Sequence, residues 1–91
     1  NHVTRLNLNR TELIDAQVSF LDHFPRLRSL NLDNNPLTRL PHVIGRMRGL
    51  MELTLRGNRI VLDGQSVADL RNLTRLQTLD LQGNPLGRVP D

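Results

Sequence analysis

The sequence predicts an α/β fold in which short parallel strands alternate with helical return segments along a solenoid. Three observations support this prediction: a recurring leucine pattern, strand-like alternation inside it, and asparagine in the turn that follows. The pattern L-x-x-L-x-L-x-x-N-x-L is clearest at Leu27, Leu50 and Leu76, and a degenerate copy begins at Val3. Successive copies start 24, 23 and 26 residues apart, and self-similarity at such a period is typical of stacked repeats.

The first element of each repeat is predicted to be a β-strand, because its central x-L-x-L-x segment alternates polar and apolar residues. The expected strands are residues 5–9, 29–33, 52–56 and 78–82. Each repeat brings the chain back in the same direction, so we expect a short parallel sheet on the concave side of a horseshoe segment. The leucines expected to face the core are Leu6, Leu8, Leu30, Leu32, Leu53, Leu55, Leu79 and Leu81.

Helices or 3₁₀ turns are expected on the convex side. In the first return segment, a helix over residues 17–24 would turn Val18, Leu21 and Phe24 inward. In the second, an apolar residue at every third position after Leu37 favours a 3₁₀-like turn, with Pro41 tolerated near its start.

The third return segment, residues 63–73, is longer and predicts a helix capped by Asp63 or Ser66. Its Val67, Leu70 and Leu73 should face the core.

The domain organisation expected is one array, residues 1–91, of about four repeats: 3–26, 27–49, 50–75 and an incomplete 76–91. Neither end carries a distinct polar capping unit, which solenoids need for solubility. We therefore expect the 91 residues to be an excerpt of a longer chain.

Asn35, Asn58 and Asn84 occupy the turn after their strands. A side-chain amide both donates and accepts, so stacked asparagines can satisfy backbone groups left unpaired where the chain leaves the sheet. We interpret these three residues as a structural ladder.

The candidate binding surface consists of the strand residues that point away from the core. It is polar, mixed in sign and without aromatic residues, which favours recognition of a protein partner by hydrogen bonds. Asp33 and Arg56 fall in one column of adjacent strands and are expected to pair. The residues are Arg5, Asn7, Asn9, Ser29, Asn31, Asp33, Glu52, Thr54, Arg56, Thr78, Asp80 and Gln82.

Composition argues against several other function classes. The chain has a net charge of +3 from twelve arginines and nine acids, but its arginines are dispersed and form no run, which disfavours nucleic acid. Without cysteine it has no disulfide, no thiolate metal site and no cysteine nucleophile. No apolar stretch reaches the length of a membrane span.

No catalytic constellation is expected either. His2, His23 and His42 lie at three different repeat positions, so stacking should not bring them together, and we expect them to face solvent rather than bind a metal. We therefore predict no metal, no cofactor and no small-molecule substrate.

The chain resembles a leucine-rich repeat domain throughout. More narrowly, residues 37–41, 44–48, 58–62 and 79–86 resemble the repeats of large bacterial, pseudomonad-type effector proteins with a C-terminal NEL-type E3 ubiquitin-ligase domain. That resemblance implies a non-catalytic interaction module that selects host proteins or holds the ligase inactive. The catalytic cysteine would lie elsewhere in the protein, which would be secreted and delivered to the host cytoplasm. The repeats here are 23–26 residues long, whereas the better-known ligases use shorter ones.

Two other functions are compatible with the sequence. The repeats could belong to a signalling scaffold or receptor ectodomain with no attached enzyme. They could also act only as a spacer between other domains, since the strand surface lacks aromatic anchors.

Overall fold

The computed structural model describes residues 3–87, in which strands and helices alternate along the chain. The strands are β1 (Arg5–Asn7), β2 (Ser29–Asn31), β3 (Glu52–Thr54) and β4 (Thr78–Asp80). The helical elements are the 3₁₀ helices η1 (Asp15–His23) and η2 (His42–Arg46) and the α-helix α1 (Gly64–Arg71).

The four strands form one parallel sheet in the order β1-β2-β3-β4, as the sequence predicted. Each strand is shorter than the five residues expected. Backbone hydrogen bonding nevertheless continues beyond the strands, since the N–H of Leu32 donates to the Thr54 carbonyl at 2.9 Å and that of Leu55 to the Asp80 carbonyl at 2.8 Å. The chain therefore remains extended and paired up to the asparagine turns.

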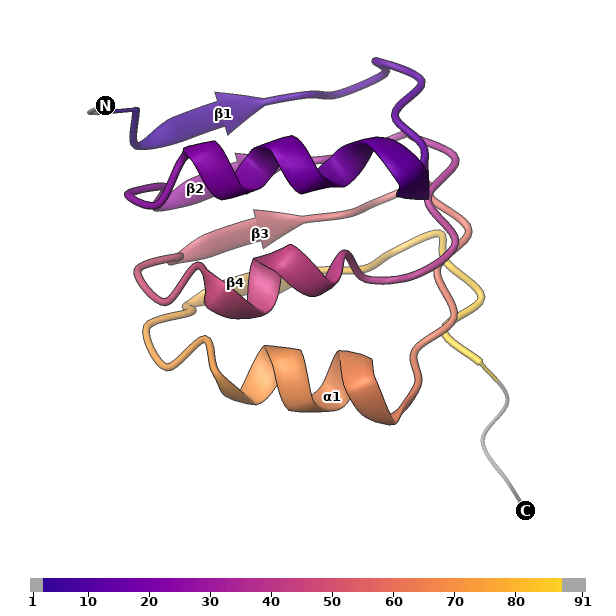
Figure 1. Ribbon diagram of the computed structural model, residues 1–91. Coiled ribbons are helices and arrows are strands. Elements are labelled where there is room, and N and C mark those ends of the chain that lie inside the picture. Colours follow the sequence, from indigo (N-terminus) through magenta and orange to yellow (C-terminus); the bar gives the residue numbers. More distant parts are fainter. Residues whose placement is uncertain (1–2, 88–91) are drawn as a thin grey trace.

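Helices η1, η2 and α1 lie side by side over one face of the sheet, and η2 contacts both of the others (Figure 1). The 3₁₀ turn predicted after Pro41 is present as η2, and the first return segment is likewise a 3₁₀ helix. Among residues 3–87, no helix combines the length and the apolar character that a membrane crossing requires.

Of the two caps predicted for α1, Asp63 is the one present, and its carboxylate accepts a hydrogen bond from the backbone N–H of Ser66 at 2.8 Å. Leu73 is buried and Leu70 packs against the core from a half-buried position. Both leucines therefore face inward as expected.

The prediction that Val67 faces the core is wrong, because its side chain is 44% exposed. Ser66 and Asp69 are buried instead. Asp69 lies against η2, where the missing side chain of Gly45 leaves room for its carboxylate: a Cβ built on Gly45 would lie 2.5 Å from Asp69 Oδ1. His42 on η2 supplies a polar partner for the Asp69 carboxylate. This contact, with the space beside Gly45, allows the polar side of α1 to face the neighbouring repeat.

The inward leucine side chains are most deeply buried in the two middle repeats. The inward leucines of β1 and β4 are less covered, and Leu79 is 40% exposed, because each outer strand has a neighbouring described repeat on one side alone. The inward leucines with at most 1% exposure are Leu30, Leu32, Leu53 and Leu55.

Candidate functional site

The sheet brings the twelve predicted binding residues together on the face opposite the helices, which we call the strand face. The register aligns them in columns across the strands; the first column contains Arg5, Ser29, Glu52 and Thr78. The strand face consists of these four residues with Asn7, Asn9, Asn31, Asp33, Thr54, Arg56, Asp80 and Gln82.

Side chains of the second column bond to their own strands rather than projecting freely. The side-chain oxygens of Asn7, Asn31 and Asp80 each accept a hydrogen bond from the backbone N–H two residues later, at 2.9–3.1 Å. Thr54 stands in the same column, and its hydroxyl is buried without a hydrogen-bond partner in the described part of the chain. This column therefore stiffens the strand ends.

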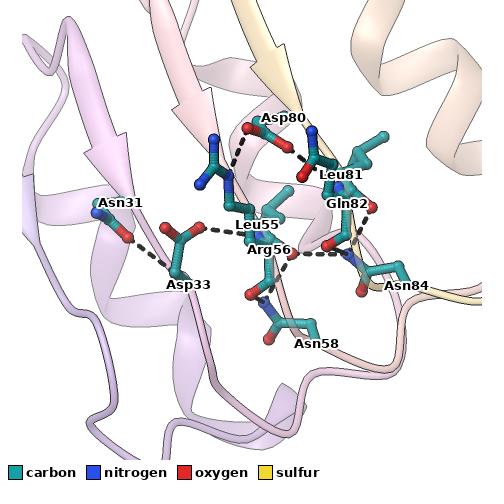
Figure 2. Close-up of polar contacts among 9 residues, drawn as sticks. All are labelled: Asn31, Asp33, Leu55, Arg56, Asn58, Asp80, Leu81, Gln82 and Asn84. Atoms are coloured by element: carbon teal, nitrogen blue, oxygen red, sulfur yellow. Dashed lines mark hydrogen bonds and ion pairs between the residues drawn. The ribbon is translucent and has the colours of Figure 1, made fainter.

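Arg56 does not form the predicted ion pair with Asp33. Its guanidinium Nε donates to Asp80 Oδ2 at 2.5 Å, while its backbone N–H donates to Asp33 Oδ1 at 2.7 Å (Figure 2). The Asp33 carboxylate thus contacts the backbone of Arg56, whereas the Arg56 side chain pairs with Asp80 of the following strand.

Asp80 is consequently held in its charged form. The backbone N–H of Gln82 has the larger effect and the Arg56 guanidinium the next, and together they hold the pKa of the Asp80 carboxyl below its ordinary value of 3.8. Hydrogen bonds and positive charge both favour a carboxylate over its neutral acid.

The asparagine ladder connects each repeat to the one before it. Asn58 Nδ2 donates to the carbonyls of Leu55 and Leu32 at 2.9 and 3.0 Å, and its Oδ1 accepts from the Leu37 N–H at 3.3 Å. Asn84 repeats this arrangement one strand later, with Nδ2 2.7 Å from the Leu55 carbonyl oxygen (Figure 2). Asn35 does the same with Leu8 and Leu32. These bonds satisfy backbone groups that would otherwise be buried without partners.

The residue before each ladder asparagine has a left-handed backbone. The φ angle is 57° at Asn34, 68° at Gly57 and 77° at Gly83. Glycine adopts this conformation without the steric cost that a Cβ incurs, and asparagine tolerates it better than most residues. A Cβ on Gly57 would in addition collide with the Asn34 side-chain oxygen.

Some side chains of the strand face remain available to a partner. Among the described residues, neither the first-column side chains nor that of Gln82 form an ion pair or side-chain hydrogen bond with another side chain or with the backbone. Arg5, Glu52, Thr78 and Gln82 are exposed, and Ser29 is half-buried.

Histidine positions differ partly from the expectation of solvent-facing side chains. The His42 side chain is 63% exposed, yet its Nδ1 lies 3.0 Å from the buried Asp69 carboxylate. His2 lies outside the described residues. Within residues 3–87, no three or more His, Asp or Glu side chains are grouped so that they could hold a metal ion.

One feature that the sequence analysis missed lies at the start of the strands. Arg26, Arg28 and Arg75 line a groove of about 510 Å³ together with Thr4, Gly49 and Met51. A signal was present in the sequence, since Arg26 and Arg75 hold the same repeat position, directly before Leu27 and Leu76.

Comparison with known proteins agrees with the repeat architecture. Residues 1–60 match the family described as leucine rich repeat, and residues 75–91 match a second model of that description. A probable serine/threonine-protein kinase, pats1, of Dictyostelium discoideum is 38% identical over 53 residues, which is 58% of this chain and 2% of the kinase. The chain thus spans a very small part of that relative. The first match alone covers well over half of the chain, and this protein belongs to the leucine-rich repeat family.

Proposed function

We propose that the chain is a non-catalytic protein–protein interaction module that uses the strand face for recognition. Repeat proteins of this kind build extended binding surfaces from neighbouring units, and the strand face is the side that the helices leave uncovered. We also infer that the repeats curve into a solenoid with the strands on its concave side.

The observation that supports this proposal best is the first column of the strand face. Arg5, Ser29, Glu52 and Thr78 lie in register on four adjacent strands, and the polar groups of their side chains have no partner among residues 3–87. The ladder fixes the strands that carry them, so little conformational freedom remains to be lost on binding. Such preorganisation lowers the entropic cost of association.

The size of this surface sets the affinity that we expect. Four strands spaced about 4.8 Å apart and each about 17 Å long present on the order of 300 Å². A standard interface uses about 800 Å² per partner and is usually dominated by aromatic or arginine anchors. We therefore expect weak binding by the strand face alone, with polar complementarity as its basis.

A paired substitution tests the proposal. Glu52→Arg reverses a charge in the first column, whereas Ala68→Arg introduces the same side chain at an exposed position of α1. Affinity purification of the intact protein from its native cells, followed by quantitative mass spectrometry, should show partners lost with Glu52→Arg and retained with Ala68→Arg. Equal recovery with both variants would contradict recognition through the strand face.

For the parent protein we propose, from the repeat resemblance, a bacterial effector in which this module selects substrates of an E3 ubiquitin ligase or restrains it. A ubiquitin-charging assay of the parent, with and without residues 1–91, tests this directly. A thiol-sensitive ubiquitin adduct that rises on deletion indicates restraint, and one lost for particular substrates indicates selection. No adduct in either form would refute the ligase context.

A second candidate is a signalling protein without ligase activity. The similarity to a Dictyostelium protein named as a probable serine/threonine kinase favours it, because that relative carries a similar repeat segment within a much longer chain. Under this alternative the strand face binds partners in the same way, so the Glu52→Arg experiment applies to both contexts.

A further inference from the structure

Charge is distributed unevenly between the two edges of the sheet. The loops that join each helix to the next strand lie together at one edge, which we call the entry edge (Figure 1). It comprises residues 3–5, 22–29, 46–52 and 71–78. These segments contain seven of the twelve arginines but two of the nine acids, a net charge of +5, which leaves −2 for the rest of the chain.

Acids do little to neutralise this edge. Of its two acids, Asp22 forms an exposed ion pair with Arg46, with Oδ2 3.4 Å from Nη1. Glu52 points from the strand face and has no ion-pair partner among the described residues. Arg28 and Arg75 likewise form no ion pair within residues 3–87. Folding thus brings together, at the entry edge, arginines that are dispersed along the sequence.

The groove of about 510 Å³ lies within this edge, and no acid lines it. Arg26, Gly49 and Arg75 occupy the same position in three successive repeats, directly before the leading leucine. Gly49 has no side chain, so a space remains between the two arginines. Neighbouring strands are about 4.8 Å apart, which places the arginine backbones about 10 Å from each other.

The interior of the groove differs in chemistry from its rim. Met51 lies between the arginines and supplies a flexible apolar surface that adapts to varied side chains. The Arg28 carbonyl there is already satisfied, since it accepts from the N–H groups of Met51 and Glu52 at 2.8 and 2.9 Å. We therefore expect side chains to recognise the ligand: guanidinium groups at the rim and an apolar surface between them.

We propose that this groove docks an acidic segment of a protein partner, with carboxylates on the arginines and an apolar side chain over Met51. Arginine binds carboxylates through paired hydrogen bonds, and a peptide in the polyproline II conformation covers about 9 Å in three residues and returns the fourth side chain to the same side. Two acids three positions apart therefore match Arg26 and Arg75. The inference rests on the proposed interaction function and adds the chemistry of the partner.

Nucleic acid fits the groove less well than an acidic peptide. Single-stranded nucleic acid is typically held by aromatic side chains on which bases stack. The two aromatic residues, Phe20 within η1 and Phe24 directly after it, pack against the core with ring centroids 6.4 Å apart, and neither lines the groove.

Two glycines provide a matched test of this site. A Cβ on Gly49 has its nearest contact at 3.9 Å, and a Cβ on Gly64 has none within 4 Å, so both positions accept a side chain without a clash. Gly49→Glu places a carboxylate in the groove, and Gly64→Glu adds the same charge at the start of α1. The probe is a fluorescein-labelled decapeptide in which glutamates three positions apart flank a leucine, and a second peptide carries glutamine in their place.

Fluorescence anisotropy with the full chain at low salt should detect binding of the glutamate peptide, and added salt should weaken it. We expect Gly49→Glu and the double variant Arg26→Gln/Arg75→Gln to raise its Kd at least about fivefold, and Gly64→Glu to leave it within about twofold. Thermal melts of each variant verify that it remains folded.

Three outcomes would overturn the proposal: equal binding of the glutamine peptide, an unchanged Kd with Gly49→Glu, or tighter binding of a single-stranded oligonucleotide than of the glutamate peptide. None of these outcomes tests recognition through the strand face. Loss of partners with Glu52→Arg would still support the interaction function when the acidic-segment proposal fails.

Discussion

Asn58 connects two repeats through a single side chain, because its Nδ2 donates to the carbonyl of Leu32 in the preceding strand at 3.0 Å. The same nitrogen bonds the Leu55 carbonyl of its own strand at 2.9 Å. Asn58 is 4% exposed, so water cannot readily replace these bonds. The ladder is therefore a structural coupling between repeats.

Asn58→Ala should destabilise the chain markedly, since it leaves the buried Leu37 N–H without an acceptor and removes one of the two asparagine donors from each of the Leu32 and Leu55 carbonyls. A buried polar group that loses its partner costs about 1–3 kcal/mol. Urea unfolding should show a lower midpoint, while Asn72→Ala, an exposed position after α1, should change it little. Equal midpoints for the two variants would exclude a stabilising role for the ladder.

Leu55→Ala tests the depth of the core. Leu55 is 0% exposed between neighbouring repeats, and removal of a buried leucine side chain costs about 2–5 kcal/mol. Leu79→Ala is the control, because Leu79 is also an inward leucine, at the first inward position of β4, but is 40% exposed. We expect it to cost less than about half as much; similar losses in calorimetry would contradict the observed gradient of burial.

Gly45→Ala should be destabilising where the same change at Gly64 is not. The added Cβ would lie 2.5 Å from the Asp69 carboxylate, which is itself buried against η2. At Gly64, the first residue of α1, the methyl group meets nothing, and alanine favours the helix over glycine by at most about 1 kcal/mol. The midpoint of thermal denaturation should thus fall for Gly45→Ala and rise for Gly64→Ala. A stabilised Gly45→Ala variant would mean that Asp69 does not occupy this position.

Acid should weaken the fold through two carboxylates. The Ser66 backbone N–H, first among several hydrogen bonds, lowers the pKa of Asp63, and the Gln82 N–H and Arg56 lower that of Asp80. A carboxyl with a lower pKa in the folded state stabilises that state above its unfolded pKa and loses this effect as pH falls. Stability should therefore decrease as the pH drops below about 3.8.

The double variant Asp63→Asn/Asp80→Asn should flatten this loss, because asparagine keeps the accepting oxygen but does not titrate. Asp22→Asn, at an exposed ion pair on η1, serves as the control. Urea midpoints measured across the acid range report the difference. An acid-induced loss of the same size in the double variant would assign it to other groups.

The regular part of the fold could be predicted because the same sequence pattern recurs in each repeat. The alternation around Leu30 and Leu53 predicts a strand in each repeat, and an asparagine at the same offset in three copies predicts the turn that follows. The order and direction of the strands follow from the period alone.

Contacts that depend on one repeat facing another were harder to predict. Val67 fits a helical core position by spacing, yet Asp69 is buried instead because Gly45, more than twenty residues earlier, leaves space for it. Arg56 has acids on both neighbouring strands, and its side chain pairs with Asp80 while its backbone N–H donates to Asp33. Neither contact is visible within a single repeat.

The basic groove shows the same dependence on alignment. Read along the chain, Arg26 and Arg75 are 49 positions apart and look unrelated. Superposing the repeats places them two strands apart with Gly49 between them. Charge should therefore be assessed by repeat position in proteins of this architecture.

Site-specific photo-crosslinking can show whether a partner protein contacts the strand face. A photoreactive phenylalanine analogue at exposed Thr78 on β4, and the same analogue at exposed Ala68 on α1, would be compared in the intact protein in its native cells. We predict a discrete crosslinked protein from position 78 and none from position 68. Crosslinks of equal yield at both positions, or from position 68 alone, would contradict the account.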